Sequence, residues 1–310
     1  MPGKFVVLAD LDGAAGVRNP HECFPNYPEF EQYGVPHMAA DANAAARGLF
    51  KGGASEVVIV DGHLIGQNLI SARVGAPAHL SAKTLLEELQ GGAVCGLFLT
   101  GIHAKTGTPN SFSSHTIAPF LAARVNGDIV GDSLLVAYLA GALDVPLVGV
   151  SGDWVACEEI QWALPWILNS PTKTGFDRAS VRHHNPDTAR ASLEEIAARA
   201  AAPGASRVVK PSREFRVELS LARAEDAQLV ARALDGAGPP NRRVFAHAGQ
   251  DFVEATAFLG TAVGAIYPAW VDGLGRRARP ETPGGYTAGG MLDTALIERF
   301  MGPTAPYWSD

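Results

Sequence analysis

The amino-acid sequence predicts a three-layer α/β/α fold with a mainly parallel sheet, an inserted β-hairpin and a smaller C-terminal α+β lobe. Short apolar runs alternate with segments of helical periodicity through the first half of the chain, and this alternation is typical of βαβ units. An Asn-Gly pair between two apolar segments interrupts it, which indicates a tight hairpin. With 310 residues, 47% of them hydrophobic, the chain is large enough for a packed core of this kind.

The elements of the α/β core follow in order along the chain. The run 5–9 is apolar without a break, as in a strand buried on both faces of a parallel sheet. Asn126-Gly127 supplies the hairpin turn. The helix at 132–143 takes Asp132 or Ser133 as its N-cap. The remaining expected elements of the core are helices at 39–50 and 81–89 and strands at 57–60, 94–99 and, in the sequence VPLVGVSGD, 145–153.

Beyond residue 155 the alternation becomes less regular, and we divide the chain into three parts. Residues 1–155 form the α/β core, 156–265 a smaller α+β lobe, and 266–310 a tail with no assigned role beyond an interface or a cover for the site. Connections rich in Pro and Gly at Asn169–Gly175 and Gly236–Pro240 are candidate hinges or ordinary surface loops. The expected elements are the helices WVACEEIQWAL, TARASLEEIAARAAA, 251–264 and Met291–Met301, and the strands EFRVELS and RRVFAHAG.

Composition and charge exclude several classes of partner. The formal net charge is −7, from 25 Lys and Arg against 32 Asp and Glu, and the sequence contains no basic run, so we expect no binding to nucleic acid. No apolar stretch approaches the roughly 20 residues that span a membrane. Three widely spaced cysteines without a CxxC motif, and an N-terminus that leads directly into a strand, predict a cytoplasmic protein with free thiols.

Polar side chains stand where three of the core strands end. Asp10 and Asp12 follow the first strand, and Asp61 and His63 follow the second. His103 follows the third. Because the carboxyl ends of parallel strands meet at one edge of a sheet, we expect these groups to become neighbours. Carboxylates and imidazoles gathered there each need a partner, and a divalent cation would satisfy all of them at once.

Taken singly, each of these residues has an ordinary interpretation. A histidine after a strand is usually a hydrogen-bonded or surface residue. Asp132 is most simply an N-cap, and Asp61 before Gly62 is typical of a turn. His115 lies in a polar loop soon after His103 and would overhang the same edge. The prediction of a site therefore depends on the group as a whole.

One chemistry that pairs two aspartates is phosphoryl transfer. The motif VVLADLDG resembles the opening motif of the haloacid dehalogenase phosphatases, in which the first Asp is the nucleophile and the second a general acid or base. Thr100, Lys105 and Asp153 would supply the later motifs of such an enzyme. However, Ala14 stands where that family carries Thr or Val, Cys157 stands where an acid is expected, and the histidines after the strands have no role.

The second chemistry is metal-dependent amide hydrolysis, since carboxylate and imidazole are zinc ligands and one carboxylate can bridge two ions. DxDG after the first strand, VDGHL, GIHAKTGTP followed by SSHT, and NGDIVGDSLLVAYLAG together resemble the zinc D-aminopeptidases encoded with dipeptide-transport systems, the DppA-like family. The resemblance covers about residues 4–265. It implies that His115 acts on the substrate. The metal ligands that it implies, with Asp10 as a bridge, are Asp10, Asp12, His63, His103 and Asp132.

The resemblance further implies a zinc aminopeptidase, with one or two Zn²⁺ per subunit, that cleaves short peptides carrying an N-terminal D-amino acid. It also implies a ring-like homo-oligomer that encloses its active sites. Asp12 and Asp132 stand where the family usually has Glu, each one methylene shorter, so oxygen ligation is kept while the metal spacing and the preferred metal stay open. Lys173 falls in a matching segment without an assigned role. A metal-binding relative without turnover is a third class that the sequence allows.

Overall fold

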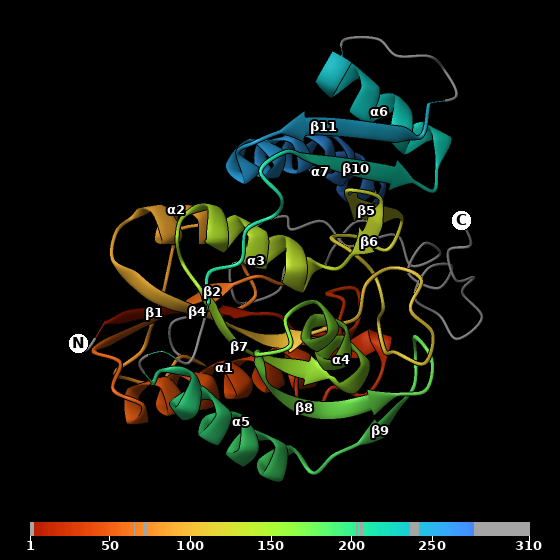
Figure 1. Ribbon diagram of the computed structural model, residues 1–310. Helices are drawn as coiled ribbons and strands as arrows, with labels where there is room; N and C mark the ends of the chain where they lie inside the picture. The colour runs from red at the N-terminus through yellow and green to blue at the C-terminus, as the bar shows by residue number, and fades with distance from the viewer. Residues whose placement is uncertain are drawn as a thin grey trace.

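The computed structural model describes residues 3–275, apart from 65, 71–72, 203, 205–206 and 236–241, and its centre is a seven-stranded sheet with the order β3-β2-β1-β4-β7-β8-β9 (Figure 1). All neighbouring strands pair in parallel except β8 and β9, which are antiparallel. The mainly parallel sheet that the sequence predicts is thus confirmed. Its strands are β1 (Lys4–Ala9), β2 (Glu56–Asp61), β3 (His79–Leu80), β4 (Val94–Ile102), β7 (Leu147–Asp153), β8 (Leu168–Gly175) and β9 (Val181–His183).

Helices cover both faces of this sheet because alternate strand residues point to opposite sides. In β1, Phe5 and Val7 belong to the core on one face, whereas Val6 belongs to the core on the other. The helices of the first face are α1 (Val35–Lys51) and α5 (Pro186–Ala200), and those of the second are α2 (Leu85–Gln90), α3 (Asp132–Ala142) and α4 (Trp154–Ala163). This is the predicted three-layer α/β/α arrangement.

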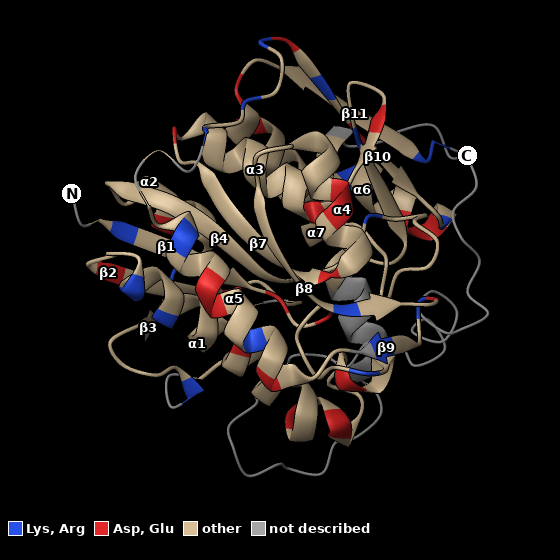
Figure 2. Ribbon diagram, turned by 60° about the horizontal axis from the view of Figure 1, so that its bottom comes forward, with Lys and Arg blue, Asp and Glu red and all other residues tan. Residues whose placement is uncertain are grey.

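The two helices of the first face approach closely because a glycine stands at their contact. A Cβ atom at Gly48 would lie 2.2 Å from the carbonyl oxygen of Glu194. At the solvent side of the same contact Arg47 and Lys51 pair with Glu194, and Figure 2 shows residues of both charge signs on α5. Exposed ion pairs contribute about 1 kcal/mol or less, so close packing rather than charge fixes these helices.

A second, antiparallel sheet of four strands within the described residues lies beyond α3, in the upper part of Figure 1. Its order is β11-β10-β5-β6, from β5 (Leu121–Val125), β6 (Asp128–Val130), β10 (Phe215–Leu221) and β11 (Val244–Gly249), and it is accompanied by α6 (Ala224–Asp235) and α7 (Phe252–Gly275). Asn126 and Gly127 have φ angles of 54° and 93°, the left-handed values of the predicted type I′ turn. The predicted hairpin and the predicted C-terminal lobe therefore build one sheet together.

Several local expectations are corrected by the structure. The predicted hinge at Asn169–Gly175 is wrong, because these residues lie within β8. The predicted N-cap at Asp132 or Ser133 is wrong as well, because Gly131 is the N-cap of α3. The sequence pattern did not indicate α6, nor the short 3₁₀ turn η1 (Pro20–Glu22) and π-helical turn η2 (Phe30–Gly34) between β1 and α1.

The predicted boundary at residue 155 falls inside the main sheet, because β8, β9 and α5 follow it in the chain. The candidate hinge Gly236–Pro240 and the predicted helix Met291–Met301 lie outside the described residues. Cys23, Cys95 and Cys157 are free thiols, as predicted. Within the described ranges, every helix is too short or too polar to cross a membrane. The cytoplasmic location stays a prediction.

Candidate metal centre

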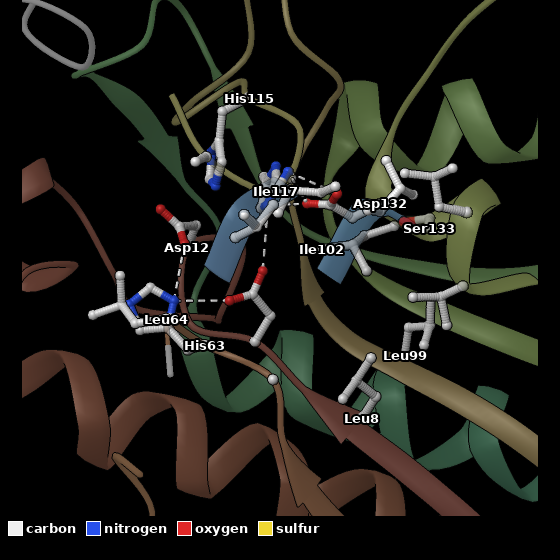
Figure 3. Close-up of a pocket in the computed structure, with 18 of the residues that line it drawn as sticks. Leu8, Asp12, His63, Leu64, Leu99, Ile102, His115, Ile117, Asp132 and Ser133 are labelled. Atoms are coloured by element: carbon white, nitrogen blue, oxygen red, sulfur yellow. Dashed lines mark hydrogen bonds and ion pairs between the residues drawn. The ribbon is translucent and has the colours of Figure 1, made fainter. Parts of the chain in front are cut away.

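Three neighbouring strands bring the predicted site residues to one edge of the main sheet. Because β1 lies between β2 and β4 and runs parallel to both, Asp10 at the end of β1 lies between His63, which follows β2, and His103, which follows β4. Asp132 comes from the first turn of α3, and His115 from the loop after β4. All six residues line one cavity (Figure 3): Asp10, Asp12, His63, His103, His115 and Asp132.

Asp10 connects two histidines through its two carboxylate oxygens. Its Oδ1 lies 2.9 Å from Nδ1 of His63, and its Oδ2 lies 3.4 Å from Nε2 of His103. Oδ2 of Asp12 also approaches Nδ1 of His63, at 3.3 Å. Oδ2 of Asp132 approaches Nε2 of His103, again at 3.3 Å. The cluster thus consists of two groups, each centred on an imidazole nitrogen, that share Asp10.

The second ring nitrogen of each of these histidines donates to a main-chain carbonyl group. Nε2 of His63 lies 2.8 Å from the carbonyl oxygen of Cys23, and Nδ1 of His103 lies 3.2 Å from that of Ala104. Since a carbonyl oxygen only accepts hydrogen bonds, these nitrogens carry the ring proton. In the neutral ring the other nitrogen then turns a lone pair towards the carboxylates, which is the arrangement of a metal-ligating histidine.

The carboxylates raise the pKa values of the histidines that they surround. Burial favours the neutral ring of His63, but Asp10 and Asp12 raise its pKa well above the ordinary value. Burial acts on His103 in the same way, but Asp132 and Asp10 raise its pKa to about 10. Burial also works to raise the pKa of Asp12, yet His63 lowers it well below the usual range. This edge of the sheet therefore requires positive charge, from ring protons or from bound cations.

Two sets of donor atoms are close enough to hold a metal ion each. One set is Asp10, Asp12 and His63, and the other is Asp12, His103 and His115, with the ligand atoms of each set within 4.8 Å of one another. Carboxylate oxygen and imidazole nitrogen are zinc ligands. The tautomers that the carbonyl groups impose on His63 and His103 place lone pairs toward these sets. The residues present therefore fit zinc.

His115 lies over the ring of His103, with the ring centroids 3.7 Å apart and the planes at 11°. Its Nδ1 donates to the carbonyl oxygen of Ser113 at 2.6 Å, which leaves Nε2 as an acceptor. Burial lowers the pKa of His115, and the neighbouring His103 lowers it further. A neutral His115 has a lone pair with which to take up a proton at neutral pH.

Ser113 is a site residue that sequence reasoning missed. Its hydroxyl donates to Oδ1 of Asp12, and its carbonyl oxygen accepts from His115. It is 1% exposed and has a φ of 54°, a left-handed conformation uncommon for a residue other than glycine. The signal was present in the motif SSHT, where a polar residue stands two positions before the histidine.

A buried lysine and a partly buried arginine hold the loop after β1 in place. Lys173 is 1% exposed and donates from Nζ to the carbonyl oxygen of Asp12 at 2.6 Å. Arg190 donates to the carbonyl oxygen of Ala15 at 2.6 Å and pairs with Asp41 at 2.8 Å. Asp41 in turn accepts from the N–H of Ala15 at 2.7 Å. Lys173, which had no assigned role in the sequence, is therefore a support of the loop that carries Asp12.

Asp61 is the last residue of β2 and not a turn residue, but its side chain organises the loop that follows the strand. Its Oδ2 accepts from the main-chain N–H groups of Asn68 and Leu69, both at 2.6 Å. Its Oδ1 accepts from the N–H of His63 at 3.1 Å. Asp61 thus shapes the loop after β2 and fixes the backbone of His63.

Of the three later residues of the phosphatase interpretation, Thr100 lines the cavity beside Asp10, but Lys105 and Asp153 are engaged elsewhere. Asp153 is fully buried and accepts from the N–H groups of Val155 and Gly175 at 2.8 and 3.0 Å, so it caps α4. Nζ of Lys105 pairs with Glu159 at 3.0 Å. Neither side chain contacts the carboxylates after β1 in the described structure. The geometry therefore does not favour phosphoryl transfer.

Comparisons with known proteins agree with the chemistry of this cluster. Residues 4–260 match the family model Peptidase_M55, described as D-aminopeptidase. The chain is 28% identical to a D-aminopeptidase of Bacillus subtilis (strain 168) over 197 residues, which are 62% of this chain and 71% of that protein. Among solved structures it is similar to the Zn-dependent D-aminopeptidase DppA from Bacillus subtilis, a self-compartmentalizing protease, with a TM-score of 0.76 and 22% identity over 85% of this chain and 98% of that one.

Proposed function

Because this chain belongs to the Peptidase_M55 family of D-aminopeptidases, we propose that it is a zinc-dependent aminopeptidase that removes an N-terminal D-amino acid from short peptides. The observation that supports zinc most strongly is the orientation of His63 and His103. Each donates one ring N–H to a carbonyl group and turns the other nitrogen towards carboxylates. The zinc dependence of the related protease of known structure supports the same metal.

The residues divide naturally between two ions. His63, Asp10 and Asp12 would hold one ion. His103 would hold the other together with Asp10 and Asp132, which both face its Nε2, and His115, the remaining histidine of the second set of donor atoms, is left for the reaction. When bound, zinc supplies a Lewis acid for the scissile carbonyl group and a water whose pKa is lowered towards about 7. The carbonyl groups behind both histidines keep their rings in the ligating tautomer.

His115 is the proposed proton carrier of the reaction. Its Nε2 accepts the proton that leaves the attacking water and returns it to the nitrogen of the leaving amine, while the peptide C–N bond breaks. The carbonyl group of Ser113 keeps the proton on Nδ1, and the stacked ring of His103 restricts how His115 can turn. This role needs the neutral form of His115, which burial favours.

The two short carboxylates still reach their partners. Asp12 contacts His63 and accepts from Ser113, and Asp132 contacts His103 while accepting from the N–H of Ile117 at 2.8 Å. A shorter side chain than the family pattern therefore keeps its place at the site, and we propose that oxygen ligation is retained at both positions.

Assembly is a further part of the proposal. The related protease of known structure is self-compartmentalizing, and we propose that this chain likewise forms a ring-like homo-oligomer that encloses its active sites. Size-exclusion chromatography with light scattering tests this, since a monomer at micromolar concentration contradicts it.

Metal analysis combined with assays on two substrates tests the proposed function. Protein freed of metal with a chelator and reloaded with Zn²⁺ is expected to bind zinc stoichiometrically and to release D-alanine from D-Ala-D-Ala. Release of phosphate from small phosphate esters in Mg²⁺ would favour the phosphatase alternative instead. Bound metal with neither activity would identify a metal-binding relative without turnover.

A further inference from the structure

The six residues of the candidate metal site, which we call the metal cluster, form only part of the lining of a larger cavity. The cavity has a volume of about 760 Å³ and is bounded by the carboxyl edge of the main sheet, α3 and α7. Figure 3 shows the site residues Asp12 and His63 at the left and Asp132 at the upper right, with the apolar residues Leu99 and Leu8 below Asp132. A volume of this size is typical of pockets that enclose a whole small ligand.

Away from the cluster the cavity wall is almost entirely apolar. Its apolar side chains come from β1, β4, α3 and α7 and include Leu8, Leu99, Leu139, Phe252, Leu259 and Val263. Among the described lining residues, the charged and titratable groups other than Tyr267 are the six of the metal cluster. A charged side chain of a substrate would therefore lose its water in this part of the cavity without gaining a partner.

Helix α7 leaves the cavity wide because two of its lining positions are glycines. Gly260 and Gly264 are one helical turn apart and lie on the same face of α7. A Cβ atom added at either position would have no neighbour within 4 Å. Both glycines are exposed at the rim of the cavity, so a larger residue would fit there without a clash and would narrow the cavity.

We propose that the apolar part of this cavity binds a large apolar side chain of the substrate, so that the preferred substrates are short peptides with a residue of leucine or phenylalanine size beside the scissile bond. This inference rests on the proposed function and names its substrate class. An alanine side chain would leave most of the apolar wall without contact, whereas a phenyl ring displaces water from it. Each methylene that fits such a pocket changes selectivity by about 10-fold or more.

The test compares four D-amino-acid dipeptides on the full zinc-loaded chain: D-Ala-D-Ala, D-Phe-D-Ala, D-Ala-D-Phe and D-Lys-D-Ala. The expected kcat/KM is at least about 10-fold higher for one phenylalanine peptide than for D-Ala-D-Ala, and lowest for the lysine peptide. A second readout, independent of turnover, is thermal unfolding, in which D-phenylalanine is expected to raise the Tm more than D-alanine does.

Two variants of α7 test whether the preference for phenylalanine arises from this cavity. Gly264→Phe adds a phenyl ring at a position that lines the cavity, where it is expected to narrow the cavity and to abolish the preference for phenylalanine in both readouts, while it raises the helix propensity of α7. Thr261→Phe adds the same ring to an exposed position of the same helix outside the cavity lining, and is expected to change neither readout.

The outcomes separate this inference from the proposed function. Hydrolysis of D-Ala-D-Ala as fast as that of both phenylalanine peptides overturns the inference and leaves the peptidase standing. A preference for phenylalanine that survives Gly264→Phe also overturns it. If none of the peptides is hydrolysed, the proposed function is overturned. In that case a rise in Tm with D-phenylalanine that disappears in Gly264→Phe still supports the apolar pocket. If D-phenylalanine does not raise the Tm either, the apolar pocket is overturned together with the proposed function.

Discussion

Asp10 and His63 face each other at the ends of the first two strands, with Oδ1 of Asp10 2.9 Å from Nδ1 of His63. Because Nε2 of this histidine donates to the carbonyl oxygen of Cys23, a neutral ring presents a lone pair to the carboxylate. Two acceptors at this distance need a proton or a cation between them. The other oxygen of Asp10 stands in the same relation to His103, and the two zinc ions that we propose would resolve both contacts.

Removal of either histidine that faces Asp10 is expected to remove metal. His63→Ala and His103→Ala should each lower the zinc content and reduce kcat/KM by more than about 100-fold, which is the upper range for the loss of a group that only orients a ligand. Metal analysis and the D-Ala-D-Ala assay measure this. His79→Ala is the matched control, because His79 is exposed and lies 3.9 Å from Glu56. Full zinc content in His63→Ala would contradict the proposed site.

Removal of the negative charge of Asp132 should change mainly the pKa of the neighbouring imidazole of His103. In the metal-free protein, Asp132→Asn is expected to lower the pKa of His103 from about 10, because the charge of Asp132 helps to raise it. Titration of the histidine ring signals by NMR measures this. Asp128→Asn, at an exposed position of β6, is the control. A pKa of His103 that is equal in both variants would show that the two side chains do not interact.

The buried amine behind the metal loop should affect zinc affinity. Lys173→Met removes the donor to the carbonyl oxygen of Asp12, and is expected to weaken zinc binding by about 10- to 100-fold. It should also lower the free energy of unfolding by about 1–3 kcal/mol, because a buried acceptor loses this donor. Zinc titration and urea unfolding measure the two effects, with the exposed Lys51→Met as control. Unchanged zinc affinity would assign Lys173 a purely structural role.

We expect His37, which lies outside the metal cluster, to make the stability of the fold depend on pH. Burial, and then the charge of Arg190, lower the pKa of His37 from 6.5 to about 4, and Arg190 donates to its Nδ1 at 3.0 Å. Between these pH values the unfolded chain binds the proton and the folded one does not, so His37 makes the free energy of unfolding rise with pH from about 4 to 6.5.

The variant His37→Gln isolates this contribution. The free energy of unfolding of the wild type, minus that of the variant, should increase with pH through this range and stay constant above it. Comparison within the pair is needed because the neighbouring Asp41, whose pKa burial raises to about 6, contributes a slope of the opposite sign. Parallel pH profiles for the two proteins would contradict the assignment.

The sequence predicted the cluster because the ends of the strands, and their parallel pairing, can be recognised from the local pattern. Each of Asp10, His63 and His103 follows an apolar run, and parallel pairing makes such positions neighbours. The N-cap prediction for Asp132 failed because its side chain accepts from Ile117 of a distant loop instead of capping its own helix. A contact of this kind has no local signature.

Two further differences have physical reasons. Pro171 and Gly175 made the segment 169–175 resemble a loop. The strand β8 nevertheless tolerates the proline, because β9 pairs only with residues 173–175 and does not pair with Pro171.

The apolar wall of the cavity was not predicted either. It joins β1, β4, α3 and α7, which are distant in sequence, and the glycines of α7 carry no local sign that they face a cavity.

The most direct test of the proposed metal site is diffraction from crystals grown with Zn²⁺, measured on both sides of the zinc absorption edge. We expect anomalous density beside Asp10, within ligand distance of His63 on one side and of His103 on the other. Anomalous density elsewhere on the molecule, with the rings of His63 and His103 turned away from Asp10, would contradict it.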